Sequence, residues 1–190
     1  MFQQEDFNNS LDVLKRGGII LYPTDTVWGI GCDATDEAAV QRIFTIKRRS
    51  ERQAMLALVD GFLMLAKYMK HTPSITTAMH IIEAYKHPVT FIYPMASYLA
   101  PNLIAEDGSI GIRVVREPFC QQLIKEFGKP IVSTSANISG SPTPTLFGEI
   151  SEEIKTSVDY VVQWRQDDLH PAAASSIIKL NLDGSYDVLR

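Results

Sequence analysis

The chain has 190 residues, of which 45% are hydrophobic and 21% charged, and its formal net charge is −4. This composition is typical of a globular protein and excludes a low-complexity or disordered chain, so we expect a single domain over residues 1–190. The acidic balance argues against a surface dominated by nucleic-acid phosphate binding, although a local basic patch is compatible with it. No apolar run approaches the ~18 residues of a membrane helix, and we expect no membrane partner.

The cysteine content and the N-terminal residues indicate a compartment. Cys32 and Cys120 are the only two cysteines, too few for a disulfide framework, which fits a reducing environment. Residues 1–6 lack the basic and apolar regions of a secretory signal peptide. We therefore expect a cytoplasmic protein.

Hydrophobic periodicity and turn residues predict helices and strands that alternate irregularly along the chain. We expect helices over residues 5–16, 36–47, 62–68, 74–85, 118–128 and 146–155. Strands are expected over residues 19–22, 55–59, 89–93, 110–115, 131–134, 160–162, 175–180 and 186–189, the last two forming a hairpin. This irregular order favours an α/β fold with a twisted mixed sheet and flanking helices.

The most informative run is residues 19–31, Ile-Ile-Leu-Tyr-Pro-Thr-Asp-Thr-Val-Trp-Gly-Ile-Gly. An apolar strand ends at three small polar residues, Thr24, Asp25 and Thr26, and Gly29 and Gly31 then allow backbone to approach a ligand closely. Many α/β folds build a small-molecule site in this way. The alternative is a Thr/Asp turn between two strands, and the run alone favours neither.

A second run, residues 130–145, repeats this logic. The apolar strand at its start leads into Ser133, Ser135, Asn137 and Thr143, whose neutral side chains both donate and accept hydrogen bonds. Such groups suit ribose, phosphate oxygens or an amino acid, whereas the alternative is a Ser/Thr-rich turn. Nucleophilic hydrolysis is poorly supported, because no histidine is near in sequence and Gly-x-Ser-x-Gly is absent.

A third run, residues 47–52, holds four cations in six residues at a predicted helix end. A solvated helix terminus is the ordinary interpretation, since cations are favourable there. Together with Arg113 and Arg116, however, these cations could surround a triphosphate or a carboxylate. A Walker phosphate loop is absent from the sequence, so phosphate binding would depend on side chains and turn amides.

In their order and spacing these motifs resemble the YrdC-like threonylcarbamoyl-AMP synthases. The resemblance rests on residues 23–31, on Lys47-x-Arg49, and on Ser135-x-Asn137 with the Ser-Gly-Ser-Pro-Thr that follows, and it covers residues 17–189. It implies a single-domain twisted α/β fold with a concave basic face. It also implies that L-threonine, bicarbonate and ATP are combined into threonylcarbamoyl-AMP and pyrophosphate, for threonylcarbamoyladenosine formation in tRNA.

The resemblance assigns roles to individual residues. The threonine-binding residues would be Thr26, Arg113 and Ser133. The ATP-binding residues would be Lys47, Arg49, Gln53, Ser109, Ser135, Asn137, Thr143, Ser175 and Ser176. Lys47, Arg49, Ser135 and Asn137 would carry the catalytic function. Mg²⁺ would accompany ATP, and no metal site made by the protein is expected.

The chemistry fits these residues, because the nucleophile belongs to the substrate. An N-carboxylated threonine attacks the α-phosphate, and the protein positions the reactants and stabilises charge. Several positions depart from the family pattern, among them Ser50, Gln53, Leu58, Lys86-His87 and residues 170–174. Leu58 stands where many members have a histidine near the threonine pocket.

Two further functional hypotheses remain open. One is a non-catalytic paralogue that binds nucleotide or double-stranded RNA. The other is a carbamoyl-transfer module like that of hydrogenase maturation proteins, which normally sits in a much longer chain. A synthase would hand its product to threonylcarbamoyl-transfer proteins, and its affinity for tRNA or other RNA would be weak, because only phosphate contacts are available.

Overall fold

The computed structural model describes residues 2–50, 55–70 and 75–190. Within these residues the strands form one sheet in the order β7-β1-β2-β6-β3-β5-β4-β8-β9. The strands are β1 (Ile20–Tyr22), β2 (Gly29–Gly31), β3 (Leu56–Val59), β4 (Val89–Tyr93), β5 (Ile110–Val114), β6 (Ile131–Ser135), β7 (Tyr160–Val161), β8 (Ser176–Leu180) and β9 (Tyr186–Val188).

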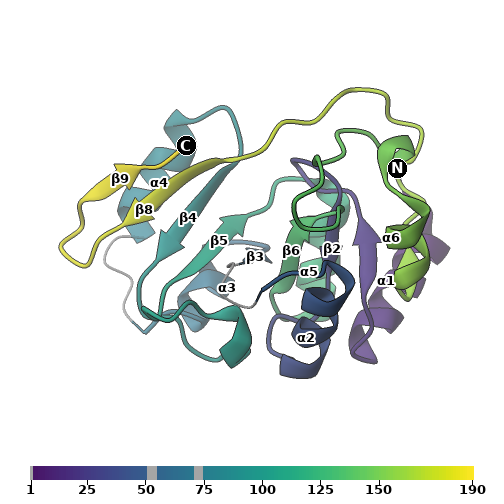
Figure 1. Cartoon of the computed structure of the whole chain (residues 1–190). Coiled ribbons are helices and arrows are strands. Elements are labelled where there is room, and N and C mark those ends of the chain that lie inside the picture. Colours follow the sequence, from purple (N-terminus) through teal and green to yellow (C-terminus); the bar gives the residue numbers. More distant parts are fainter. Residues whose placement is uncertain (1, 51–54, 71–74) are drawn as a thin grey trace.

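The sheet is mixed, as the irregular alternation of elements predicted. The pairs β1–β7, β3–β5 and β4–β8 are parallel, and the remaining neighbours are antiparallel. Figure 1 shows that β4, β8 and β9 are turned strongly relative to β1 and β2, so the sheet is twisted. The predicted fold class is therefore confirmed.

Helices flank this sheet. They are α1 (Gln4–Lys15), α2 (Glu37–Ile46), α3 (Phe62–Lys67), α4 (Ile75–Ala84), α5 (Pro118–Phe127) and α6 (Glu152–Ser157), with short 3-10 turns η1 (Pro101–Leu103) and η2 (Phe147–Glu149). Asp36 caps α2 and Glu117 caps α5, each by accepting backbone N–H bonds in the first turn. In the described part of the chain no helix combines the length and apolar character needed to cross a membrane.

The prediction of one helix over residues 146–155 is wrong. The structure has the 3-10 turn η2, then extended backbone at Ile150 and Ser151, and only then α6. The Ser151 side chain accepts a hydrogen bond from the Ile154 N–H and so begins a new helix. A serine that caps locally competes with helix continuation, which explains the break.

Strand β2 was predicted only by the alternative interpretation of residues 19–31, a turn between two strands, because glycine has low strand propensity. Gly31 nevertheless pairs with Ile20 of β1, and a Cβ on Gly31 would lie 2.4 Å from the Val132 carbonyl oxygen and 2.6 Å from Tyr22 Cε1. Gly31 is thus required by close packing inside the protein, and the expectation that it brings backbone to a ligand is wrong. The corresponding expectation for Gly29 fits the structure, because Gly29 lines a cavity.

One long connection joins the two ends of this sheet. Residues 162–175 lead from β7 to β8, which lie near opposite edges of the strand order. We call them the crossing segment, and in Figure 1 they run across the top of the view above the central strands. Because the central strands carry the predicted site residues, the crossing segment is placed to contact the same region.

Candidate functional site

The predicted site residues gather where β2, β3 and β6 meet. Gly29 pairs with Ser135, and Leu56 pairs with Ser133, so the start of β2, the start of β3 and the carboxyl end of β6 lie side by side. The polar residues that follow β1 and β6 in sequence are therefore neighbours in space. Two adjoining cavities open here and share part of the β6 wall.

The first of these, the small cavity, has a volume of about 190 Å³. Thr26, Arg113 and Ser133 all line it. These are the three residues assigned to threonine by resemblance, and they come from a loop, from β5 and from β6. Thr143 and Ser175, expected at the nucleotide, also line the small cavity.

Arg113 is one of two arginines that line the small cavity, the other being Arg190. Its side chain is only 3% exposed, and its Nε lies 3.0 Å from Asp25 Oδ1. An ion pair of this kind offsets part of the cost of burying the guanidinium, although these two atoms do not form a hydrogen bond. Arg113 therefore brings a buried positive charge to the wall of the small cavity, where it can attract an anionic ligand.

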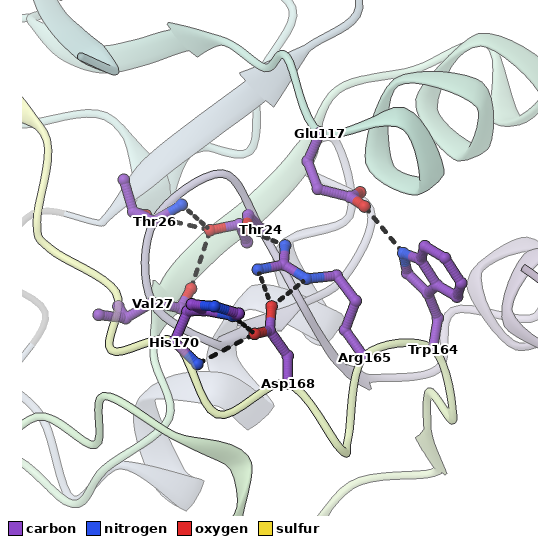
Figure 2. A network of polar contacts seen from close by, with 8 residues as sticks. All are labelled: Thr24, Thr26, Val27, Glu117, Trp164, Arg165, Asp168 and His170. Carbon is purple, nitrogen blue, oxygen red and sulfur yellow. Dashed lines mark hydrogen bonds and ion pairs between the residues drawn. The ribbon is translucent and has the colours of Figure 1, made fainter. Parts of the chain in front are cut away.

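Thr24 organises the polar loop that carries Thr26 (Figure 2). Thr24 Oγ1 accepts a hydrogen bond from the Thr26 N–H at 3.0 Å and donates to the Val27 carbonyl at 2.8 Å. The two threonine hydroxyls are themselves 3.0 Å apart. The structure therefore combines both interpretations of the 19–31 run, because the turn with side-chain bonds is also a wall of the cavity.

The second, large cavity has a volume of about 360 Å³. Arg49 and Ser109 line it together with Ser135, and all three were assigned to ATP by resemblance. The rest of its wall is mostly apolar and includes Met55, Ile92, Ile110 and Ile177. A cavity of this size falls at the lower end of the ~300–1,000 Å³ usual for small-molecule sites.

Arg49 supplies positive charge to the large cavity. Its Nη1 lies 3.4 Å from Thr134 Oγ1, and burial lowers the pKa of its guanidinium from the usual value. Its neighbour Arg48 points elsewhere, because its side chain is 69% exposed and pairs with Glu153 at 2.6 Å. The basic run at residues 47–50 is thus divided between the cavity and the surface.

Lys47 is buried, with 1% of its surface exposed. Its Nζ donates hydrogen bonds to the backbone carbonyls of Ser135 and Asn137, the latter at 2.7 Å. Burial, with a smaller contribution from the Arg49 charge, lowers the pKa of Lys47 to about 8. Through these hydrogen bonds Lys47 stabilises the turn after β6, and its side chain lines neither cavity.

Two other predicted residues, Asn137 and Ser176, are also absent from the cavity walls. The Asn137 side chain donates to the Ile138 and Ser141 carbonyls, so it shapes its own loop. Ser176 begins β8 and is absent from both linings. Gln53 lies outside the described residues. Leu58 is fully buried and lines neither cavity.

Arg190 is a candidate that the sequence did not reveal. It lines both cavities, and its Nε and Nη2 donate to the Ser175 carbonyl at 3.2 and 3.0 Å. Ser175 Oγ is in turn 2.8 Å from Thr90 Oγ1, a residue of the large cavity. The sequence pattern predicted a strand over residues 186–189 but gave no signal that Arg190, which follows it, reaches the site.

The charges around both cavities favour an anionic ligand. Among the described residues the linings contain three arginines, Arg49, Arg113 and Arg190, and no aspartate or glutamate. Their hydroxyl groups, from Thr26, Ser133 and others, suit uncharged polar parts of a ligand. The site is thus equipped to bind and orient an anion, and it offers hydrogen bonds and charge for catalysis.

Comparisons with known proteins show which family the chain resembles. The Sua5/YciO/YrdC family model, described as "Telomere recombination", matches residues 12–190. The threonylcarbamoyl-AMP synthase of Pseudoalteromonas translucida is 31% identical, with 85% of this chain and 87% of the relative covered. That of Hahella chejuensis is 36% identical, with 80% and 82% covered.

A solved structure supports the fold. The structure of P. abyssi Sua5 complexed with L-threonine has a TM-score of 0.82 and is 24% identical. It covers 95% of this chain, whereas this chain spans 52% of the P. abyssi protein, about half its length. With the family model matched over nearly the whole length, the chain belongs to the Sua5/YciO/YrdC family.

Proposed function

We propose that this protein is an L-threonylcarbamoyladenylate synthase, a nucleotidyltransferase that forms threonylcarbamoyl-AMP and pyrophosphate from L-threonine, bicarbonate and ATP. The observation that carries the proposal is the small cavity. Thr26, Arg113 and Ser133, which the family resemblance assigns to threonine, line it together and adjoin the cavity that holds Arg49. Relatives with 27–36% identity are named for this activity.

The small cavity matches the groups of an amino acid. The buried Arg113 guanidinium has the planar donors that suit a carboxylate, and its ion pair with Asp25 holds it in place. The hydroxyls of Thr26 and Ser133 can bond to a ligand hydroxyl or amine. L-threonine would therefore bind through all three of its polar groups.

The large cavity, next to it, would hold ATP. Its apolar wall suits a nucleobase, and Arg49 and Arg190 supply charge for phosphates. We retain Lys47 and Asn137 in the catalytic set because they fix the turn after β6, on which Ser135 lies. Mg²⁺ would arrive on the phosphate oxygens of ATP, because the described linings offer it no carboxylate.

The reaction needs no nucleophile from the protein. The threonine amine combines with bicarbonate, releasing water, and gives a carbamate. A carbamate oxygen then attacks the α-phosphorus of ATP, and the bond to pyrophosphate breaks. The site contributes by bringing the two reactants together and by stabilising negative charge on the phosphates with its arginines.

We further propose a cytoplasmic location and transfer partners. Cys32 and Cys120 are free and buried, which is compatible with a reducing compartment. The product is a reactive mixed anhydride, so it would pass to proteins that transfer the threonylcarbamoyl group to tRNA. Direct contact with RNA would be weak, as the acidic net charge indicates.

Comparing threonine with valine tests this proposal. Valine has nearly the same shape as threonine but carries a methyl group in place of the hydroxyl. A site that hydrogen-bonds the hydroxyl should favour threonine over valine in kcat/KM by more than the ~10–200-fold that one methylene group gives. We expect Ser133→Ala to lower the ratio of kcat/KM for threonine to kcat/KM for valine, with pyrophosphate release as the measured reaction. Ser141→Ala is the matched control, because Ser141 is exposed and outside both linings. Equal turnover of valine and threonine by the wild type would contradict the assignment of the small cavity.

A further inference from the structure

The first residues of the crossing segment are held by hydrogen bonds to residues that lie outside both cavities. The backbone N–H groups of Gln163 and Trp164 each donate to the buried Asp6 carboxylate at 2.9 Å. Trp164 Nε1 also donates to Glu117 at 2.9 Å, as Figure 2 shows. These three bonds hold residues 163 and 164 without any help from the residue that follows them.

Arg165, the next residue, has an unusual backbone. Its φ is 65°, in the left-handed region that side-chain-bearing residues rarely adopt. Such a conformation is unfavourable by itself and persists where the surroundings enforce it. Backbone hydrogen bonds from the Gln166 N–H to the Gln163 carbonyl and from the Asp168 N–H to the Arg165 carbonyl form a turn around this residue, and the contacts of the Arg165 side chain add to them.

The Arg165 guanidinium bridges two parts of the molecule (Figure 2). Nη1 donates to the Thr24 backbone carbonyl at 3.1 Å. Nε and Nη2 both donate to Asp168 Oδ2, at 3.0 and 2.8 Å. The other Asp168 oxygen accepts the His170 N–H at 3.0 Å, so Asp168 is itself fixed. The His170 and Arg165 bonds keep the pKa of Asp168 below its usual range, and the pair stays charged at neutral pH.

Thr24 passes this constraint to Thr26 through its hydroxyl. A hydroxyl has one hydrogen to donate, and Thr24 Oγ1 gives its hydrogen to the Val27 carbonyl. The contact between Thr24 Oγ1 and Thr26 Oγ1 must then use the Thr26 hydrogen. Thr26 Oγ1 is consequently left with lone pairs, and it can accept from a ligand but not donate to it.

We propose that Arg165, clamped by Asp168, is a positioning residue for the small cavity: it fixes Thr24 so that the Thr26 hydroxyl is held as a hydrogen-bond acceptor for the amine or hydroxyl of threonine. The ligand side of this inference rests on the proposed function. The guanidinium lies behind Thr24 and lines neither cavity. Losing it therefore disturbs the threonine side and leaves the nucleotide side intact.

Arg165→Gly is the most informative variant. Glycine adopts positive φ without strain, so the backbone path is kept while the guanidinium is removed. We expect the KM for threonine to rise about tenfold, the effect of one weakened hydrogen bond, and the KM for ATP to stay within about twofold. Arg42→Ala removes an exposed Arg–Asp pair of the same type, Arg42–Asp159, and should change neither value.

Asp168→Ala tests the clamp. If Asp168 acts only through Arg165, the double variant with Arg165→Gly should raise the KM for threonine no further than Arg165→Gly alone. Multiplying effects in the double variant would show that Asp168 acts independently, and that result overturns the clamp. An equal rise in both KM values for Arg165→Gly would indicate general loosening and would overturn the positioning role.

Hydrogen exchange at the Thr26 amide separates this inference from the proposed function. That amide is bonded to Thr24 Oγ1, so its protection measures the order of the loop without any substrate. We expect faster exchange in Arg165→Gly than in the wild type and in Arg42→Ala. Unchanged exchange would overturn the inference even in an active enzyme. Faster exchange in a protein that makes no product would leave the positioning of Thr26 standing and would refute only the synthase.

Discussion

At the scale of single residues, the burial of Lys47 has consequences for both stability and activity. Its Nζ is enclosed by backbone carbonyls, and its pKa is lowered to about 8 from the ordinary 10.5. The folded protein therefore releases this proton at lower pH than the unfolded chain does. Between these two pKa values the unfolded chain binds more protons.

The predicted result is that Lys47 makes the free energy of unfolding rise with pH between about 8 and 10.5. Burial disfavours the charged form of Lys47, so deprotonation removes the free-energy cost of burying that charge in the folded protein. Urea denaturation at several pH values should show this rise in the wild type relative to Lys47→Met, which cannot titrate. If the difference between the two proteins is flat or falls with pH, the lowered pKa of Lys47 is wrong.

Activity should change in the opposite direction. Loss of the Lys47 charge weakens the bonds that fix the turn after β6, on which Ser135 lies, so kcat/KM for ATP falls as pH rises through about 8, while stability from this group increases. Arg48→Ala is the matched control, because the Arg48 side chain is exposed and pairs with Glu153. It should keep the wild-type pH profile. A Lys47→Met profile that retains the fall would assign it to another group.

At the scale of elements, strand β2 depends on the absence of a side chain at Gly31. An added Cβ would meet the Val132 carbonyl and the Tyr22 ring, and Tyr22 is fully buried and bonded to that same carbonyl at 3.0 Å. We expect Gly31→Ala to lower the free energy of unfolding by about 1–3 kcal/mol or more, as overpacking does. Urea denaturation measures this change.

Gly148→Ala provides the comparison, since a Cβ there meets nothing within 4 Å. It should stay within about 0.5 kcal/mol of the wild type, as surface substitutions do. Similar losses for both glycines would show that backbone entropy, and not the close contact in β2, determines the effect.

The elements that could be predicted are those whose signals are local. The helix ending at Gly128 and the strand at residues 89–93 follow from periodicity and turn residues alone. The prediction of one helix over residues 146–155 was wrong because Ser151 does not continue a helix but caps the start of α6. Strand β2 followed only from the alternative interpretation of residues 19–31, because only contacts across the sheet make Gly31 necessary.

The site divides in the same way. Thr26, Arg113 and Ser133 were found because they lie in motifs, and the structure places them together. Asp6 and Arg165 were missed because their partners are distant in sequence. Asp6 is 157 residues from Gln163, and Arg165 is 141 residues from Thr24. A carboxylate in the first helix that holds the backbone of a late loop leaves no local pattern.

At the scale of the whole molecule, the negative net charge and the arginines of the two cavities predict how the protein meets RNA. We expect weak binding that falls steeply with salt and has no sequence preference, because phosphate contacts alone would drive it. ATP should compete, since both polyanions would use Arg49. Fluorescence anisotropy with a labelled tRNA and an unrelated RNA of equal length measures this. Tight binding at physiological salt and saturating ATP would favour an RNA-binding paralogue.

Identifying the product tests the central claim most directly. The purified protein is incubated with MgATP, L-threonine and carbon-labelled bicarbonate. The nucleotides are then separated, and their masses are determined by mass spectrometry. We expect threonylcarbamoyl-AMP that carries the label, formed with one pyrophosphate per molecule and absent when threonine is omitted. We also expect Arg113→Lys, which loses the planar fork, to form much less. Pyrophosphate release without a labelled adenylate, or no reaction under conditions where ATP and threonine bind, would contradict the central claim.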